Sequence, residues 1–257
     1  MTMTMMMHVL SGGRLRMRKS VFLPATDRSV SIELPVSSIL LRHGRANVLF
    51  DTGCHPAVVD NAEQRWGGMA KIMTPIMGPS DNVIAGLSAL GLRADDIDLV
   101  VNSHFHPDHC GCNAFFAKAT VIVHARELEA AQAPGHTERG YLSVEWRHPM
   151  PIKTVAGQYD VFGDGRIVLV SLPGHTPGTV GALAVLERSG TFLLASDALS
   201  LRETLDRGVV PRNTWNAEQF LASLAEIRRI EATGATVLCG HDALQWRQLR
   251  KGADAYE

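Results

Sequence analysis

Apolar residues gather in short runs rich in β-branched side chains along most of the chain. Runs of this length, bounded by glycine, proline and small polar residues, are typical of strands. The pattern predicts strands over residues 37–41, 47–50, 97–101, 120–123, 167–171, 182–186, 192–195 and 236–239.

Helical spacing appears between these runs. Ile84, Leu87 and Leu90 follow a cap at Asp81 or Asn82, and residues 125–131 are rich in helix formers. Asn216 caps a third helix, which Gly234 would close; its apolar positions are Phe220, Leu221, Leu224, Ile227 and Ile230. Strands and helices mixed along the whole length predict an α/β or α+β sandwich, in a single domain over residues 1–257. Residues 62–80 and 133–158 have the weakest pattern, and we expect them to form loops beside a site.

Composition narrows the classes of function. With 46% hydrophobic residues over 257 positions, the chain can bury a large core. A net charge of −1 provides no basic field for nucleic acid, and no apolar run is long enough for a membrane span. The first seven residues include five methionines without the pattern of a signal peptide, so residues 1–7 are expected to be a frayed terminus. A cytoplasmic protein without nucleic-acid or membrane partners is therefore expected.

One short segment concentrates the candidate chemistry. His104, His106, Asp108 and His109 directly follow the predicted strand 97–101, and Pro107 favours an irregular turn there. Because neighbouring side chains diverge in such a turn, the four groups suit two metal ions better than one. Imidazole and carboxylate ligands favour Zn²⁺, with Fe, Mn or Co as alternatives. The four cysteines are expected to be reduced, with Cys110 and Cys112 as buried packing thiols.

The segment His104-Phe-His-Pro-Asp-His109 resembles the HxHxDH motif of the metallo-β-lactamase superfamily. Four further segments resemble the other motifs of that superfamily, in the same order. They are Phe50-Asp-Thr-Gly53, Pro173-Gly-His-Thr-Pro-Gly178, Ala195-Ser-Asp-Ala198 and Cys239-Gly-His-Asp242. This resemblance implies a four-layer αββα sandwich with a dinuclear site at one edge, between the two sheets.

The resemblance also implies the ligands of two zinc ions. One ion would bind His104, His106 and His175, the other would bind Asp108, His109 and His241, and Asp197 would bridge them. A hydroxide between two such cations is a nucleophile at neutral pH. Asp51 is expected to orient a ligand histidine or the HxHxDH turn, the alternative being a tight turn alone.

Within the superfamily, the chain resembles the compact lactonases most, above all the N-acyl homoserine lactone lactonases that quench quorum sensing. Sixteen residues after His241 leave no room for a glyoxalase II-like helical domain. Balanced charge disfavours nucleases, and Asp197 stands where true class B β-lactamases carry a cysteine ligand. The resemblance implies ring opening of a small lactone by metal-bound hydroxide, Asp108 as the catalytic proton shuttle, and a homodimer.

Two positions depart from the lactonase pattern. Pro107 replaces an aromatic residue inside HxHxDH, and Ser200 replaces a tyrosine associated with the substrate carbonyl. Either the metals alone polarise that carbonyl, or Tyr141 or Tyr159 approaches it, or the substrate differs. Trp66, Met69, Met73 and Met77 are candidates to line an acyl-chain groove, the alternative being that they pack a loop onto the core.

Other functions remain open on the same ligand set. The alternatives are hydrolysis of another lactone or ester, as in 4-pyridoxolactonase, and hydrolysis of a phosphodiester. A mononuclear iron oxidoreductase and a non-catalytic metal-binding protein are the remaining alternatives.

Overall fold

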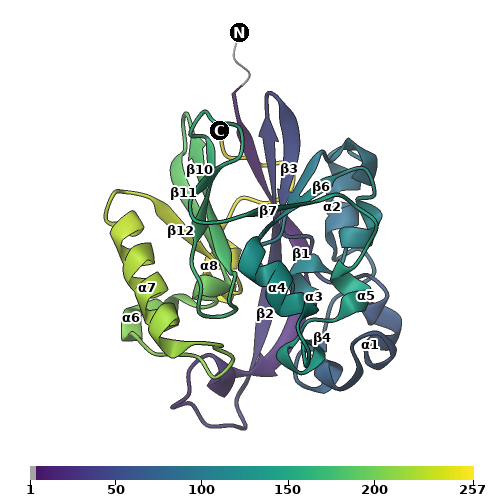
Figure 1. Ribbon diagram of the computed structural model, residues 1–257, viewed down its shortest axis with the longest axis vertical. Coiled ribbons are helices and arrows are strands. Elements are labelled where there is room, and N and C mark those ends of the chain that lie inside the picture. The colour runs from purple at the N-terminus through teal and green to yellow at the C-terminus, as the bar shows by residue number, and fades with distance from the viewer. Residues whose placement is uncertain (1–3) are drawn as a thin grey trace.

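The computed structural model describes residues 4–257 and consists of two sheets packed face to face, with helices on both outer faces (Figure 1). The first sheet has the strand order β4-β1-β2-β3-β5-β6-β7 and the second has the order β12-β11-β10-β9-β8. The strands of the first sheet are β1 (Met6–Arg18), β2 (Ser31–His43), β3 (Ala46–Phe50), β4 (Thr74–Pro75), β5 (Leu99–Val101), β6 (Thr120–His124) and β7 (Ile152–Val155). Those of the second are β8 (Tyr159–Asp160), β9 (Ile167–Ser171), β10 (Val180–Leu186), β11 (Gly190–Ser196) and β12 (Thr236–Cys239). The predicted four-layer αββα sandwich is confirmed.

The helices divide between the two outer faces. Those on the side of the first sheet are α1 (Val58–Trp66), α2 (Val83–Ala89), α3 (Pro107–Cys110), α4 (Ala125–Gln132) and α5 (Ser143–Trp146). On the side of the second sheet lie α6 (Arg202–Arg207) and α7 (Ala217–Glu231), while α8 (Ala243–Gln248) contacts β2. No helix within residues 4–257 is both long and apolar enough to cross a bilayer.

Both faces of the first sheet are covered, which explains its continuous apolar runs. In β3, Leu49 joins the core under the helices, whereas Val48 and Phe50 join the core between the two sheets. Successive side chains of a strand point to opposite faces, so a strand buried on both sides needs apolar residues at every position. The short runs in the sequence therefore predicted these strands well.

The expectation of a frayed terminus over residues 1–7 is wrong for the residues that the structure describes near that end. Met5 and Met7 are fully buried between the sheets, and Met7 pairs with Leu41 of β2. Unbranched methionine side chains fill irregular spaces in a core, so a methionine-rich start is compatible with a buried strand. Residues 1–3 lie outside the described residues.

The two segments expected to be loops are partly regular. Residues 62–80 include the end of α1, the 3₁₀ helix η2 (Gly67–Lys71) and β4, and residues 133–158 include α5 and β7. Tertiary contacts stabilise these short elements where the local pattern is weak. The HxHxDH segment also differs in part from the irregular turn expected there, because Pro107 begins the one-turn helix α3.

All five motifs follow the carboxyl ends of strands. Asp51 follows β3, the HxHxDH segment follows β5, and the remaining three motifs follow β9, β11 and β12. Within each sheet these strands run in the same direction, since β3 and β5 pair in parallel and so do β11 and β12. The sandwich thereby gathers residues from distant parts of the chain at one edge.

Candidate metal centre

Three histidine rings converge at this edge of the sandwich. The Nδ1 atom of His106 lies 3.1 Å from Nε2 of His104 and 3.0 Å from Nε2 of His175. His104 and His106 come from the segment after β5, whereas His175 comes from the loop between β9 and β10. These three nitrogens form a group that one metal ion can bind together.

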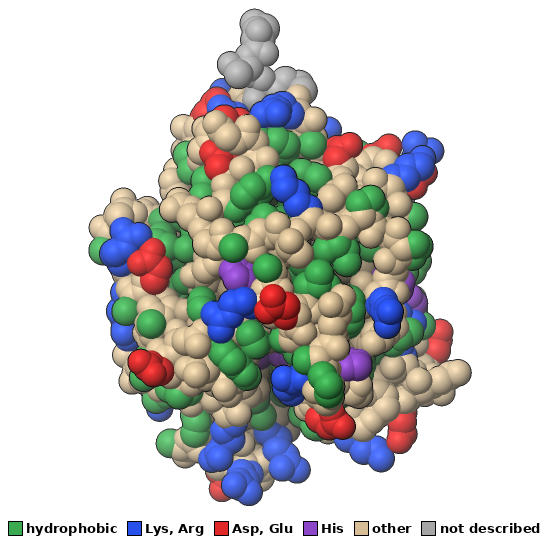
Figure 2. All heavy atoms as spheres, viewed as in Figure 1, with side chains coloured by type: hydrophobic (Ala, Val, Ile, Leu, Met, Phe, Trp, Pro, Cys, Tyr) green, Lys and Arg blue, Asp and Glu red, His purple; other side chains and the backbone are tan. Residues whose placement is uncertain are grey.

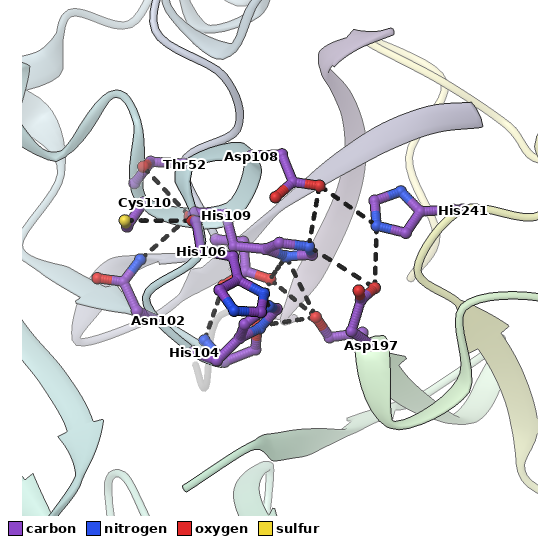
Figure 3. Close-up of polar contacts among 12 residues, drawn as sticks. Thr52, Asn102, His104, His106, Asp108, His109, Cys110, Asp197 and His241 are labelled. Atoms are coloured by element: carbon purple, nitrogen blue, oxygen red, sulfur yellow. Dashed lines mark hydrogen bonds and ion pairs between the residues drawn. The ribbon is translucent and has the colours of Figure 1, made fainter. Parts of the chain in front are cut away.

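A second cluster lies beside the first and consists of Asp108, His109 and His241. The Oδ2 atom of Asp108 is 3.6 Å from Nε2 of each of the two histidines. Asp197 lies between the clusters, with Oδ2 3.3 Å from Nε2 of His175 and Oδ1 2.9 Å from Nε2 of His241. Figure 3 shows the carboxylate of Asp197 pointing toward His109 and His241 of the second cluster. The structure thus brings together all seven residues predicted as ligands.

The outer ring nitrogens of these histidines have partners of their own. His106 Nε2 lies 3.1 Å from the Arg139 carbonyl, and His241 Nδ1 lies 2.9 Å from the carbonyl of Pro35. A carbonyl oxygen only accepts, so each outer nitrogen carries a proton, and the inner nitrogen would offer its lone pair to a bound metal ion. Partners of this kind set the tautomer and orientation of metal-binding histidines.

Asp51 performs the same task for His109 with a carboxylate. Its Oδ2 atom is 2.8 Å from Nδ1 of His109, and its Oδ1 atom accepts the backbone N–H of Ser103 at 2.7 Å. The residue is buried and has a φ of 57°, a conformation that aspartate tolerates better than most side chains. This geometry matches the predicted orienting role and makes the DTG segment more than a tight turn.

The electrostatics differ between the two clusters. Burial lowers the pKa of His104 and His106, and it lowers the pKa of His175 to about 4. Burial also opposes the charged form of His109, but the carboxylates of Asp108 and Asp51 outweigh it and raise the pKa of His109 to about 10. The first cluster therefore offers neutral imidazoles, while carboxylates surround the second.

The donor set fits transition-metal ions. The Nε2 atom of His109 is buried and has no hydrogen-bond partner within residues 4–257, as expected of a ligand atom. Nitrogen and carboxylate donors without thiolate suit zinc and also iron, manganese or cobalt. Cys110 and Cys112 are buried free thiols that donate to backbone carbonyls, in agreement with the packing role predicted for them.

A cavity of about 360 Å³ opens above both clusters. Members of both clusters line its floor, namely His106, Asp108, His175, Asp197 and His241. Its walls include apolar side chains from the β1–β2 segment, from the residues after α1 and from the loop before α7: Met17, Phe22, Met69, Ile72, Met73 and Trp215. A larger open groove of about 1330 Å³ shares only His241 with the two clusters.

Only some of the residues predicted to contact substrate line this cavity. Met69 and Met73 line it, whereas Trp66, Pro107 and Ser200 do not. Trp66 is buried, and its indole N–H donates to Glu145 at 2.8 Å. Ser200 is also buried, and Pro107 packs at the start of α3, so these three predictions are wrong for the cavity as it stands.

The structure also gives the positions of three other candidate residues from the sequence, Tyr141, Tyr159 and Asp242. Tyr141 lines the cavity, with its ring centre 5.6 Å from that of His106. Tyr159 belongs to β8 and packs with the core between the sheets. Asp242 caps α8 by accepting the N–H groups of Leu244 and Gln245.

Met17 and Phe22 of the cavity wall were not predicted. Nothing in the local pattern of the β1–β2 segment points to a site, because it reaches the cavity only through tertiary packing. Charged side chains of both signs are interspersed over the face in Figure 2, with Lys and Arg gathered at its lower end, so surface charge does not mark the site either.

A three-histidine cluster beside a histidine–carboxylate cluster, at one edge of an αββα sandwich, is typical of metal-dependent hydrolases. The family model of the metallo-β-lactamase superfamily matches residues 32–241, and the chain belongs to that superfamily.

Its similarity to curated proteins extends beyond the matched domain. N-acyl homoserine lactonase AttM of Azorhizobium caulinodans is 30% identical, over 98% of both chains. N-acyl homoserine lactonase AiiB of Agrobacterium fabrum is 31% identical, over 90% of this chain and 88% of its own.

A solved N-acyl homoserine lactone hydrolase, with its product N-hexanoyl-L-homoserine at the catalytic metal centre, superposes with a TM-score of 0.89. It is 26% identical, over the full length of both chains. A variant of B. thuringiensis AiiA with N-decanoyl-L-homoserine at the active site gives the same score, identity and coverage. The predicted resemblance to N-acyl homoserine lactone lactonases is confirmed.

Proposed function

We propose that this protein opens the lactone ring of N-acyl homoserine lactones at a dinuclear zinc centre. The observation that carries the proposal is Asp197, which lies between two ligand clusters on the floor of a cavity with apolar walls. The lactonase relatives and the product-bound structures similar to this chain support the substrate class.

Each of the two clusters would provide the ligands of one zinc ion. His104, His106 and His175 would hold one zinc ion, Asp108, His109 and His241 would hold the other, and Asp197 lies where its carboxylate could serve both. When bound, two such ions would supply a hydroxide nucleophile and polarise the lactone carbonyl.

The side chains of the cavity provide orientation and a proton. The apolar wall formed by Met69, Met73 and Trp215 excludes water from an acyl chain and holds the ring over the clusters. Ring opening turns the ring oxygen into an alcohol, which needs a proton as the bond breaks. Asp108 is the carboxyl group on the cavity floor that we assign to deliver it.

The hydroxyl group of Ser200 does not take part. Its side chain is buried outside the cavity, and its carbonyl accepts the backbone N–H of His241. Ser200 therefore supports the loop that carries a ligand, and carbonyl polarisation depends on the metals.

The test is pH-monitored ring opening of N-hexanoyl and N-decanoyl homoserine lactone by the zinc-loaded protein. We expect rapid acid release that is lost on chelation, restored by zinc and lost in Asp108→Asn. Asp242→Asn is the matched control, because Asp242 adjoins His241 in the sequence but caps α8 and accepts the backbone N–H of Arg202, outside both clusters. Its rate should stay near that of the wild type.

Absence of acid release from a protein loaded with two zinc ions would refute the lactonase proposal. Turnover of 4-pyridoxolactone, another ester or a phosphodiester probe would then identify the substrate. A single bound iron ion would instead favour an oxidoreductase.

A further inference from the structure

Glu127 is a fully buried carboxylate in the first turn of α4. It lies outside both ligand clusters and does not line the cavity above them. A buried carboxylate costs free energy unless hydrogen bonds replace the water that it loses. Its partners therefore reveal what it stabilises.

Three hydrogen bonds reach the Glu127 carboxylate. Its Oε1 atom accepts the backbone N–H of Phe105 at 3.0 Å. Its Oε2 atom accepts the hydroxyl of Thr176 at 2.7 Å and the backbone N–H of Gly178 at 3.1 Å. Burial raises the pKa of Glu127, and these donors act in the opposite direction.

These donors belong to the two segments that carry the three-histidine cluster. Phe105 stands between His104 and His106, and Thr176 directly follows His175. One oxygen of the carboxylate therefore binds the segment after β5, and the other binds the loop between β9 and β10. The two segments come from different sheets, and Glu127 joins them side by side.

The packing around this link is tight. A Cβ atom added to Gly178 would lie 2.4 Å from the backbone nitrogen of Glu127, so only glycine allows this approach of the loop to α4. The second cluster is oriented differently, through contacts of His109 with Asp51 and of His241 with Pro35.

We propose that Glu127 is a positioning residue that sets the spacing of His104, His106 and His175, and thereby the affinity of one of the two metal sites. The inference rests on the two metal sites of the proposed function. It concerns metal binding at the three-histidine cluster rather than lactone turnover.

The test is zinc binding by Glu127→Gln, measured by competition with a chromophoric chelator. Glutamine keeps one acceptor oxygen, so its NH₂ group must oppose a backbone N–H, either that of Phe105 or that of Gly178, and at least one of the hydrogen bonds is lost. We expect one of the two zinc sites to weaken about 10- to 100-fold while the other keeps its affinity. In a zinc titration of the variant followed by histidine-selective ¹⁵N NMR, the ring signals of His104, His106 and His175 should reach their zinc-bound positions at a higher zinc concentration than in the wild type.

Glu145→Gln is the matched control. Glu145 is an equally buried glutamate, but its partners are Arg65 and Trp66, outside both clusters. It should lose stability and keep both zinc affinities. If Glu127→Gln does not fold, Thr176→Val removes a single donor, and a smaller weakening of the same site is expected.

The inference would be overturned if both zinc sites of Glu127→Gln kept the affinity of the wild type. Equal weakening of both sites would also overturn it. A wild-type protein that binds fewer than two zinc ions would also overturn it. A wild-type protein that binds two zinc ions but opens no lactone would refute the proposed function alone, and selective weakening in Glu127→Gln would still support the role of Glu127.

Discussion

The contact between Asp51 and His109 provides a quantitative test of how the centre is held. In Asp51→Asn, a single acceptor oxygen must replace two. If it faces His109, the amide NH₂ opposes the N–H of Ser103, which now donates to Oδ1 at 2.7 Å. If it faces Ser103, the NH₂ group opposes Nδ1 of His109, and the ring must move its proton to Nε2, the atom that faces the cluster.

Either arrangement removes at least one hydrogen bond to a buried charge, which costs about 1.5–3 kcal/mol of the free energy of unfolding. For a chain of this size, each kcal/mol lowers Tm by about 2–4 °C, so we expect a decrease of about 3–12 °C. The affinity of the site with Asp108, His109 and His241 should fall about 10- to 100-fold.

The assays are thermal unfolding followed by circular dichroism, and zinc competition with a chelator. The control is Asp164→Asn, because Asp164 also lies 2.8 Å from a histidine, His43, but is 38% exposed and remote from the site. Such exposed pairs contribute about 0–1 kcal/mol, and zinc binding should not change. A Tm and a zinc affinity of wild-type value in Asp51→Asn would refute the reasoning.

Three further outcomes are expected. Chelation should lower Tm, and zinc should restore it, because Nε2 of His109 is buried and has no hydrogen-bond partner among the described residues 4–257; an unchanged Tm would contradict a metal role. Burial lowers the pKa of His55 from 6.5 to about 4. The unfolded chain thus binds this proton more tightly, and the contribution of His55 to stability should be lost as pH falls from 6.5 to about 4. His55→Gln should flatten the dependence of Tm on pH over that range, and an unaltered profile would count against the assignment. Met73→Ala and Met77→Ala should each lose about 2–5 kcal/mol of stability, since both residues are buried. Only Met73 lines the cavity, so only its variant should raise KM for N-decanoyl more than for N-hexanoyl homoserine lactone; equal effects in both variants would exclude a cavity role.

Much of this protein could be predicted from local sequence. All eight predicted strands are present, because strands covered on both faces need continuous apolar runs. The HxHxDH segment identified the site, since its metal-ligating side chains lie within six residues. The order of the other motifs then pointed to His175, Asp197 and His241, and the structure brings all three to that segment.

The N-terminal strand could not be predicted in this way. Residues 6–18 mix methionine, glycine, serine and arginine, and the segment becomes a strand because it pairs with β2 along its length. Backbone pairing and burial, rather than local preference, decide such a strand.

Tertiary structure also decided which residues surround the cavity above the two clusters. Met73 and Met77 are four positions apart and chemically identical, and both pack in the same core cluster, yet of the two only Met73 also lines the cavity. Likewise, Tyr141 lines the cavity, whereas Tyr159 packs against the core between the two sheets.

The sequence by itself indicated the candidate metal ligands and the strands that precede them, because both depend on side-chain chemistry within short segments. The tertiary structure decided how the two clusters meet at Asp197 and how Glu127 joins segments from different sheets. Those contacts connect residues 22 to 49 positions apart, which strand pairing within each sheet and the packing of one sheet on the other bring together.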